Sequence, residues 1–85
     1  MKEEKRILVD ITVPPMERSF DFEVDVSETV LSVKLCVEAI IEDSTGLKFD
    51  TSKREMFLFR TAEFMDDDST LDKQGIADGD RIFLI

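Results

Sequence analysis

Two stretches near the start of the chain alternate between apolar and polar residues, the period typical of half-buried β-strands. In residues 7–13 every odd position is Ile or Val, and in residues 19–26 every even position is Phe or Val. Pro14 and Pro15 end the first stretch, because a prolyl nitrogen cannot donate a hydrogen bond to a sheet. Two alternating stretches joined by so short a connection predict a β-hairpin.

The period changes to that of an α-helix after residue 29. The apolar positions are then spaced by three, four, three and one residues: Val30, Val33, Val37, Ile40 and Ile41. The polar positions off this stripe are Ser32, Lys34, Glu38 and Glu42. Thr29 is a candidate N-cap, and Gly46 can end the helix in left-handed backbone. These signals predict a helix over residues 30–42, with Leu31 and Leu35 on the side away from the stripe.

The rest of the chain contains shorter elements. Residues 54–60 predict a third strand with apolar residues on both faces, and residues 64–65 a small edge strand. Residues 71–76 are typical of a single helical turn closed by a glycine. The alternating residues 81–85 predict a last strand.

The order strand, strand, helix, strand, strand, strand indicates an α+β fold of the β-grasp type, in which one helix packs across a mixed sheet. The first and last strands are then expected to be central and parallel. The 85 residues predict a single domain over 1–85, with residues 1–5 expected to be flexible. The predicted core consists of the inward-facing apolar residues: Ile7, Val9, Ile11, Val13, Phe20, Phe22, Val24, Val26, Val30, Val33, Val37, Ile40, Leu71, Ile76, Ile82 and Leu84.

This layout resembles ubiquitin over nearly the whole chain, most closely in the helix from Thr29 to Val37 and in the segment from Thr70 to Leu84. The run Gly75-Ile76-Ala77-Asp78-Gly79-Asp80, followed by an alternating strand, is similar to the YukD/EsaB family. Those are small bacterial ubiquitin-like proteins associated with type VII secretion. The resemblance implies a protein-binding accessory or regulator of that secretion system.

The end of the sequence departs from ubiquitin. Ubiquitin and the sulfur-carrier proteins finish in a flexible tail with a terminal Gly-Gly, whereas Leu84-Ile85 lies within the predicted last strand. We therefore expect a module that is not conjugated to other proteins. Two alternatives stay open: a modifier or sulfur carrier whose Gly-Gly tail lies beyond this sequence, and one ubiquitin-like domain of a larger protein.

Composition and charge narrow the functional classes. The chain has no His, Trp or Tyr and a single Cys, which removes most catalytic dyads, disulfide scaffolds and Cys/His zinc sites. The net charge of −9 argues against nucleic acid and anionic membranes as partners. No apolar run is long enough to insert into a bilayer, and one unpaired thiol suits a reducing compartment, so a cytoplasmic location is expected.

Two features that suggest chemistry have structural interpretations. Cys36 has no His anywhere in the chain to lower its pKa, so we expect a small packed apolar side chain there. Asp66-Asp67-Asp68 does not have the alternating spacing or glycine of a calcium loop, and predicts a solvated turn. We therefore expect no enzymatic activity, no cofactor and no metal.

The sheet face away from the helix is the candidate site. Burying two arginines beside the core would be costly, so the third strand is expected to turn Met56 and Leu58 outward together with Arg54 and Arg60. On this interpretation the second strand places its acidic residues on the same face. The predicted protein-binding surface is an apolar patch edged by arginines: Leu8, Arg54, Met56, Leu58, Arg60, Arg81 and Phe83. Its partner is another protein, such as a secretion-system component; a weak homodimer is the alternative.

Overall fold

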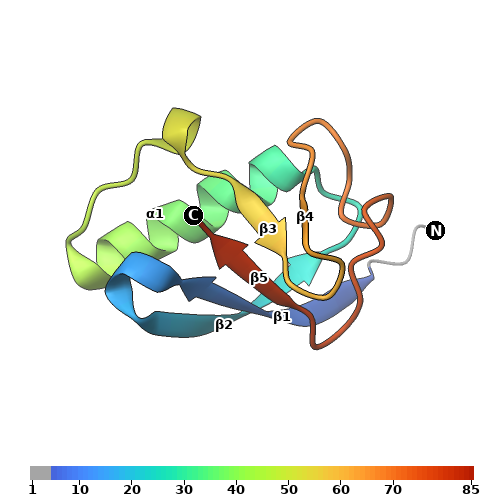
Figure 1. Ribbon diagram of the computed structural model, residues 1–85, viewed down its shortest axis with the longest axis horizontal. Helices are drawn as coiled ribbons and strands as arrows, with labels where there is room; N and C mark the ends of the chain where they lie inside the picture. The colour runs from blue at the N-terminus through green and yellow to red at the C-terminus, as the bar shows by residue number, and fades with distance from the viewer. Residues whose placement is uncertain (1–4) are drawn as a thin grey trace.

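The computed structural model describes residues 5–85, whose arrangement is shown in Figure 1. Its elements follow in the order β1 (Arg6–Val13), the 3₁₀ turn η1 (Pro14–Met16), β2 (Arg18–Asp25), α1 (Val30–Thr45), the 3₁₀ turn η2 (Thr51–Lys53), β3 (Met56–Leu58), β4 (Glu63–Phe64) and β5 (Arg81–Leu84). The order of the helix and the five strands is the predicted one, whereas the two 3₁₀ turns were not predicted. Residues 1–4, for which flexibility is expected, lie outside the described residues.

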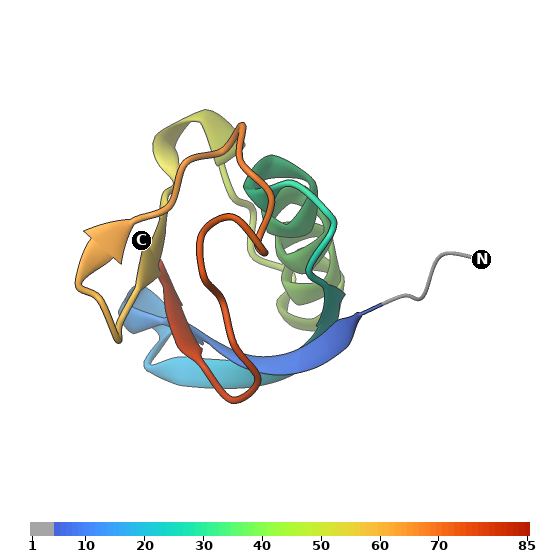
Figure 2. The same ribbon diagram turned by 90° about the vertical axis from the view of Figure 1, so that its right-hand side faces the viewer.

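The strands form one five-stranded sheet in the order β2-β1-β5-β3-β4. β1 and β5 are central neighbours and pair in parallel, whereas the other pairs are antiparallel. Figure 2 shows the sheet curving around α1, which covers one of its faces and leaves the other face open. The predicted α+β, β-grasp arrangement is confirmed. Within residues 5–85, no helix is both long and apolar enough to cross a membrane.

Local signals define the ends of α1. The backbone N–H of Ser32 donates to the Thr29 hydroxyl at 3.1 Å, so Thr29 is the predicted N-cap. Gly46 ends the helix with a φ of 76°, in the left-handed region that a side chain disfavours. The helix continues to Thr45, one turn beyond the expected end at residue 42.

Most of the predicted core is buried, and α1 supplies one correction. Ile40 was expected inside, but 47% of its surface is exposed, whereas Ile41 is fully buried. Ile41 follows Val37 by four residues and continues the stripe, so the helical rotation carries Ile40 toward β2 and solvent. Cys36, expected to be packed, is exposed on the same side of the helix.

The third strand corrects a larger part of the prediction. Met56 and Leu58 are fully buried members of the core and do not face outward. The reason is that β3 spans only Met56–Leu58, so both arginines lie outside it and impose no burial penalty on that face. Met65, which follows β4, is a further core residue that the sequence pattern did not predict.

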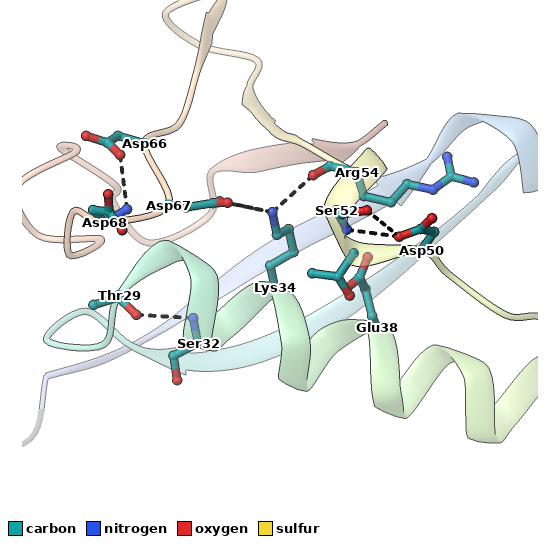
Figure 3. A network of polar contacts seen from close by, with 11 residues as sticks. Thr29, Ser32, Lys34, Glu38, Asp50, Ser52, Arg54, Asp66, Asp67 and Asp68 are labelled. Atoms are coloured by element: carbon teal, nitrogen blue, oxygen red, sulfur yellow. Dashed lines mark hydrogen bonds and ion pairs between the residues drawn. The ribbon is translucent and has the colours of Figure 1, made fainter.

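Lys34 and Glu38 lie off the predicted stripe, yet both are buried. The Lys34 ammonium donates to both carboxylate oxygens of Asp67, at 3.0 and 2.9 Å, and to the Arg54 carbonyl at 3.0 Å (Figure 3). Glu38 accepts a hydrogen bond from the Thr51 hydroxyl at 2.6 Å. These contacts tie α1 to the loop after β4 and to the approach to β3. The predicted solvated turn at 66–68 is exposed at Asp66 and Asp68, and Asp67, with 42% of its side chain in solvent, also anchors the loop to α1.

Candidate protein-binding surface

The open face carries a cluster of aromatic side chains from β3, β4, β5 and the turn after β3. Phe57 is central, because its register places it opposite both Phe64 on β4 and Phe83 on β5. Its ring lies 5.2 Å from that of Phe64, edge to face, and 6.3 Å from that of Phe83. Phe59, one residue beyond β3, meets Phe83 edge to face at 5.7 Å. We call these four residues the phenylalanine cluster.

The phenylalanine cluster is only partly covered by the rest of the chain. Phe59 is 58% exposed and Phe64 is 61% exposed, while Phe57 and Phe83 are half-buried beneath them. Edge-to-face pairs contribute roughly 0.5–1.5 kcal/mol each beyond their burial, which holds the rings in place without removing them from water. The result is a contiguous, ordered apolar surface of the kind that marks interaction sites.

Of the seven predicted residues, the structure places three on the open face: Leu8, Arg81 and Phe83. They do not form one patch. Thr12 pairs with Phe83 and Asp10 pairs with Arg81, so Leu8 lies further along β1. The Arg81 guanidinium approaches the Asp10 carboxylate at 3.6 Å, and this ion pair separates Leu8 from the phenylalanine cluster.

The predicted basic edge is not present, because each arginine has its own partner within the chain. Arg60 donates to both carboxylate oxygens of Asp80 at 3.0 Å and to the Gly75 carbonyl at 2.7 Å. Arg54 lies over the ring of Phe49, with its guanidinium carbon 5.5 Å from the ring centroid, and not beside Arg60. The arginines therefore hold loops and strand ends together.

The Arg60–Asp80 contact also shifts both ionisation equilibria. The hydrogen bonds from Arg60 lower the pKa of the Asp80 carboxyl, against the opposing effect of its burial, and the Ala77 N–H adds a further bond at 2.8 Å. The same contact raises the pKa of Arg60. Asp80 is buried where the chain enters β5, so this pair fixes the turn after β3 against the last loop.

The acidic part of the predicted polarity is confirmed. Asp21 and Glu23 on β2 are exposed on the open face, at the opposite end of the sheet from β3 and β4. Arg6 approaches Glu23 at 3.7 Å. The open face thus runs from carboxylates at the β2 edge, through the Arg81–Asp10 ion pair, to phenylalanine rings at the β4 edge.

Sequence reasoning missed Phe57, Phe59 and Phe64 as members of the surface. Residues 55–59 alternate, so Phe57 and Phe59 share one face of the strand and Met56 and Leu58 the other. Either pair could be the buried one, because both are apolar. Phe64 was a second signal, because it is an aromatic residue in a short edge strand. The pair Phe64-Met65 is flanked by acidic residues in the sequence.

Comparison with known proteins identifies the fold. No protein-family model matches the sequence, and no curated protein matches it. Among solved structures, the chain is similar to a ubiquitin from Caldiarchaeum subterraneum, with 22% identity over 95% of this chain and 92% of that one, and a TM-score of 0.77. The chain has the ubiquitin-like fold.

Two ubiquitin-like domains of other proteins are similar to the same extent. The domain of the Arabidopsis thaliana protein At2g32350 is 24% identical, with a TM-score of 0.75, over 95% of this chain and 77% of that one. The N-terminal ubiquitin-like domain of the 4931431F19Rik protein is 15% identical, with a TM-score of 0.77, over 100% of this chain and 78% of that one. At these identities the ubiquitin-like comparison establishes the fold, and the residues of this chain must carry any functional argument.

Proposed function

We propose that this chain is a non-enzymatic protein-binding module that docks another protein through the phenylalanine cluster. The observation that carries the proposal is the exposure of Phe59 and Phe64 on rings that are already ordered by their neighbours. Covering one large apolar side chain contributes about 1.5–3 kcal/mol, so two such rings can dominate an interface. Because the rings already contact one another in the unbound chain, association costs them less side-chain entropy than it would cost isolated rings.

The chemistry of the partner follows from the surroundings of the cluster. Asp10 and Arg81 neutralise one another at its inner border, and Glu63 lies beside Phe64 at its outer border. A complementary partner offers an apolar pocket or groove for the rings, with few charges at its centre. Free arginines at the edge of this surface would favour an acidic partner, but Arg54, Arg60 and Arg81 are engaged within the chain.

A narrower form of the proposal names a component or regulator of type VII secretion as the partner, in the cytoplasm of a bacterium. The secretion partner rests on the similarity of the segment Gly75–Asp80 to the YukD/EsaB family, and the cytoplasmic location on the single unpaired thiol and the short apolar runs. That segment forms the turn into β5 and holds Asp80 against Arg60, which is a structural role. The test is whether the partner captured by the phenylalanine cluster is a subunit of that machinery or an unrelated protein.

The proposal is tested by quantitative affinity capture from the source cells with matched variants. Phe59→Asp and Phe64→Asp each place a charge in the cluster, and we expect the recovered partner to fall at least about tenfold for each. Leu35→Asp is the control, because Leu35 is 49% exposed but lies on α1, away from the open face. Equal recovery with all three variants, each verified as folded, would overturn this assignment of the surface.

A further inference from the structure

A groove of about 340 Å³ lies between α1 and β2, and β2 is an edge strand of the sheet. Its apolar lining comes from Phe22 and Val24 on β2 and from Val33, Cys36 and Ile40 on α1. The exposure of Ile40 and Cys36, unexpected for a helix that packs on a sheet, is explained by this groove. We call it the β2–α1 groove.

The strand that borders the groove has an unpaired backbone edge. The Val26 N–H donates to the Lys5 carbonyl at 3.0 Å, which sets the phase of the antiparallel ladder between β1 and β2. The N–H and C=O groups of Ser19, Asp21 and Glu23 therefore point away from β1. Among residues 5–85, no backbone hydrogen bond outside the ladder uses these three residues. Such an edge is a template for one more strand.

The side chains of a strand added at this edge would alternate between two environments. One set would enter the β2–α1 groove against Phe22 and Ile40. The other set would lie on the open face beside the carboxylates of Asp21 and Glu23, both of which are exposed. Glu28 adds a further carboxylate at the groove, while Arg6 offsets part of the charge through its contact with Glu23 at 3.7 Å.

We propose that the β2–α1 groove binds an extended peptide segment of a partner protein in which apolar and basic residues alternate. The peptide would pair with the β2 backbone, insert its apolar side chains into the groove and place its Lys or Arg side chains next to Asp21 and Glu23. A second copy of this chain is disfavoured, because pairing two β2 edges would bring identical rows of carboxylates together. This site is separate from the phenylalanine cluster, since β1 and β5 lie between β2 and β3.

Cys36 provides a direct reporter, because it is the single cysteine of the chain and lines the groove. The probe is a synthetic peptide of about six residues in which Val and Lys alternate, a length typical of one strand. We expect saturating peptide to slow alkylation of the Cys36 thiol at least about fivefold, with amide shifts concentrated in β2. Ile40→Asp and the charge-reversing pair Asp21→Lys with Glu23→Lys should each weaken binding about tenfold or more.

Three control peptides separate strand addition from attraction to a protein of net charge −9. A block peptide with the same composition, a peptide with Glu in place of Lys, and a peptide N-methylated on the edge-pairing amides should all leave Cys36 reactivity unchanged. Protection by the block or N-methylated peptide would overturn the proposal. So would dimerisation that protects Cys36 without peptide, which would make a second copy the occupant.

A final comparison distinguishes this inference from the proposed function. Phe59→Asp should leave peptide binding at the β2–α1 groove unaltered, because Phe59 follows β3 near the other end of the sheet. If Phe59→Asp abolishes peptide binding, the peptide occupies the phenylalanine cluster and the groove assignment is wrong. Loss of partner capture by Phe59→Asp together with intact peptide binding supports two separate sites.

Discussion

The two faces of β3 differ sharply although their residues differ little in hydrophobicity. Met56 and Leu58 face α1 and are fully buried, whereas Phe57 faces the open side and carries Phe64 and Phe83 against its ring. The covered face thus contributes to stability, because its side chains leave water when the chain folds. The open face retains apolar surface in water, which a stable monomer does not need and a partner can cover. Apolar content alone does not distinguish these roles.

The largest expected effect is a loss of stability on the covered face. Leu58→Ala or Met56→Ala would open a cavity in the core and lower the free energy of unfolding by about 2–5 kcal/mol. For a domain of this size the melting temperature would fall by roughly 4–8 °C for each kcal/mol. Urea unfolding monitored by circular dichroism measures the change. A cost below about 1 kcal/mol would mean that Met56 and Leu58 do not face the core.

Substituting either member of the Lys34–Asp67 ion pair should lower the free energy of unfolding, but by different amounts. Asp67→Asn leaves the Lys34 ammonium buried with a weakened partner, and we expect a loss of about 3 kcal/mol. Lys34→Met removes the charge and keeps an apolar side chain of similar length, so the expected loss is smaller, about 1–2 kcal/mol. The same unfolding measurement compares the two. The reverse order of the two losses would contradict the account of this ion pair.

Asp80 fixes the turn after β3, because its carboxylate accepts two hydrogen bonds from Arg60 in that turn. Its folded-state pKa lies below its unfolded-state pKa, so the ionised carboxylate stabilises the fold at pH values above the unfolded pKa. This contribution is lost as the pH falls through the folded-state pKa. Asp80→Asn should cost about 1 kcal/mol at pH 7, and the difference from the unsubstituted chain should vanish in strong acid. A difference independent of pH would show that the charge is not responsible.

On the open face, the expected effect on stability is small beside that of the core substitutions. Phe59→Ala and Phe64→Ala remove side chains that are mostly in water, so the free energy of unfolding should change by less than about 1.5 kcal/mol, the upper value for one aromatic pair. Partner binding should nevertheless weaken strongly. If either variant unfolds as readily as Leu58→Ala, the ring is a core residue and the contrast between the two faces is lost.

The sequence was sufficient where the signals are local. The β1–β2 hairpin, the Thr29 cap, the Gly46 stop and the parallel pairing of the first and last strands all follow from spacing and turn chemistry. The outward position of Phe83 was also correct, because Ile82 and Leu84 alternate with it and both are buried.

The sequence was not sufficient where a partner lies far along the chain. From its position off the apolar stripe, Lys34 is expected to be solvated. It is buried because the fold brings Asp67, 33 residues away in the sequence, into contact with it. The face assignment of β3 failed because its end at Leu58 depends on the turn that Arg60 and Asp80 hold, 20 residues apart in sequence. Alternation fixes which residues share a face, but it does not say which face is covered.

Site-specific photo-crosslinking tests the central claim most directly. A benzophenone amino acid replaces Phe64 in the phenylalanine cluster in one variant and Leu35 on α1 in the other, both exposed positions. We predict that irradiation in the source cells yields a discrete crosslinked protein from position 64, which Phe59→Asp in the same chain abolishes, and none from position 35. The same crosslinked protein from both positions, or from position 35 alone, would contradict a docking surface at the phenylalanine cluster.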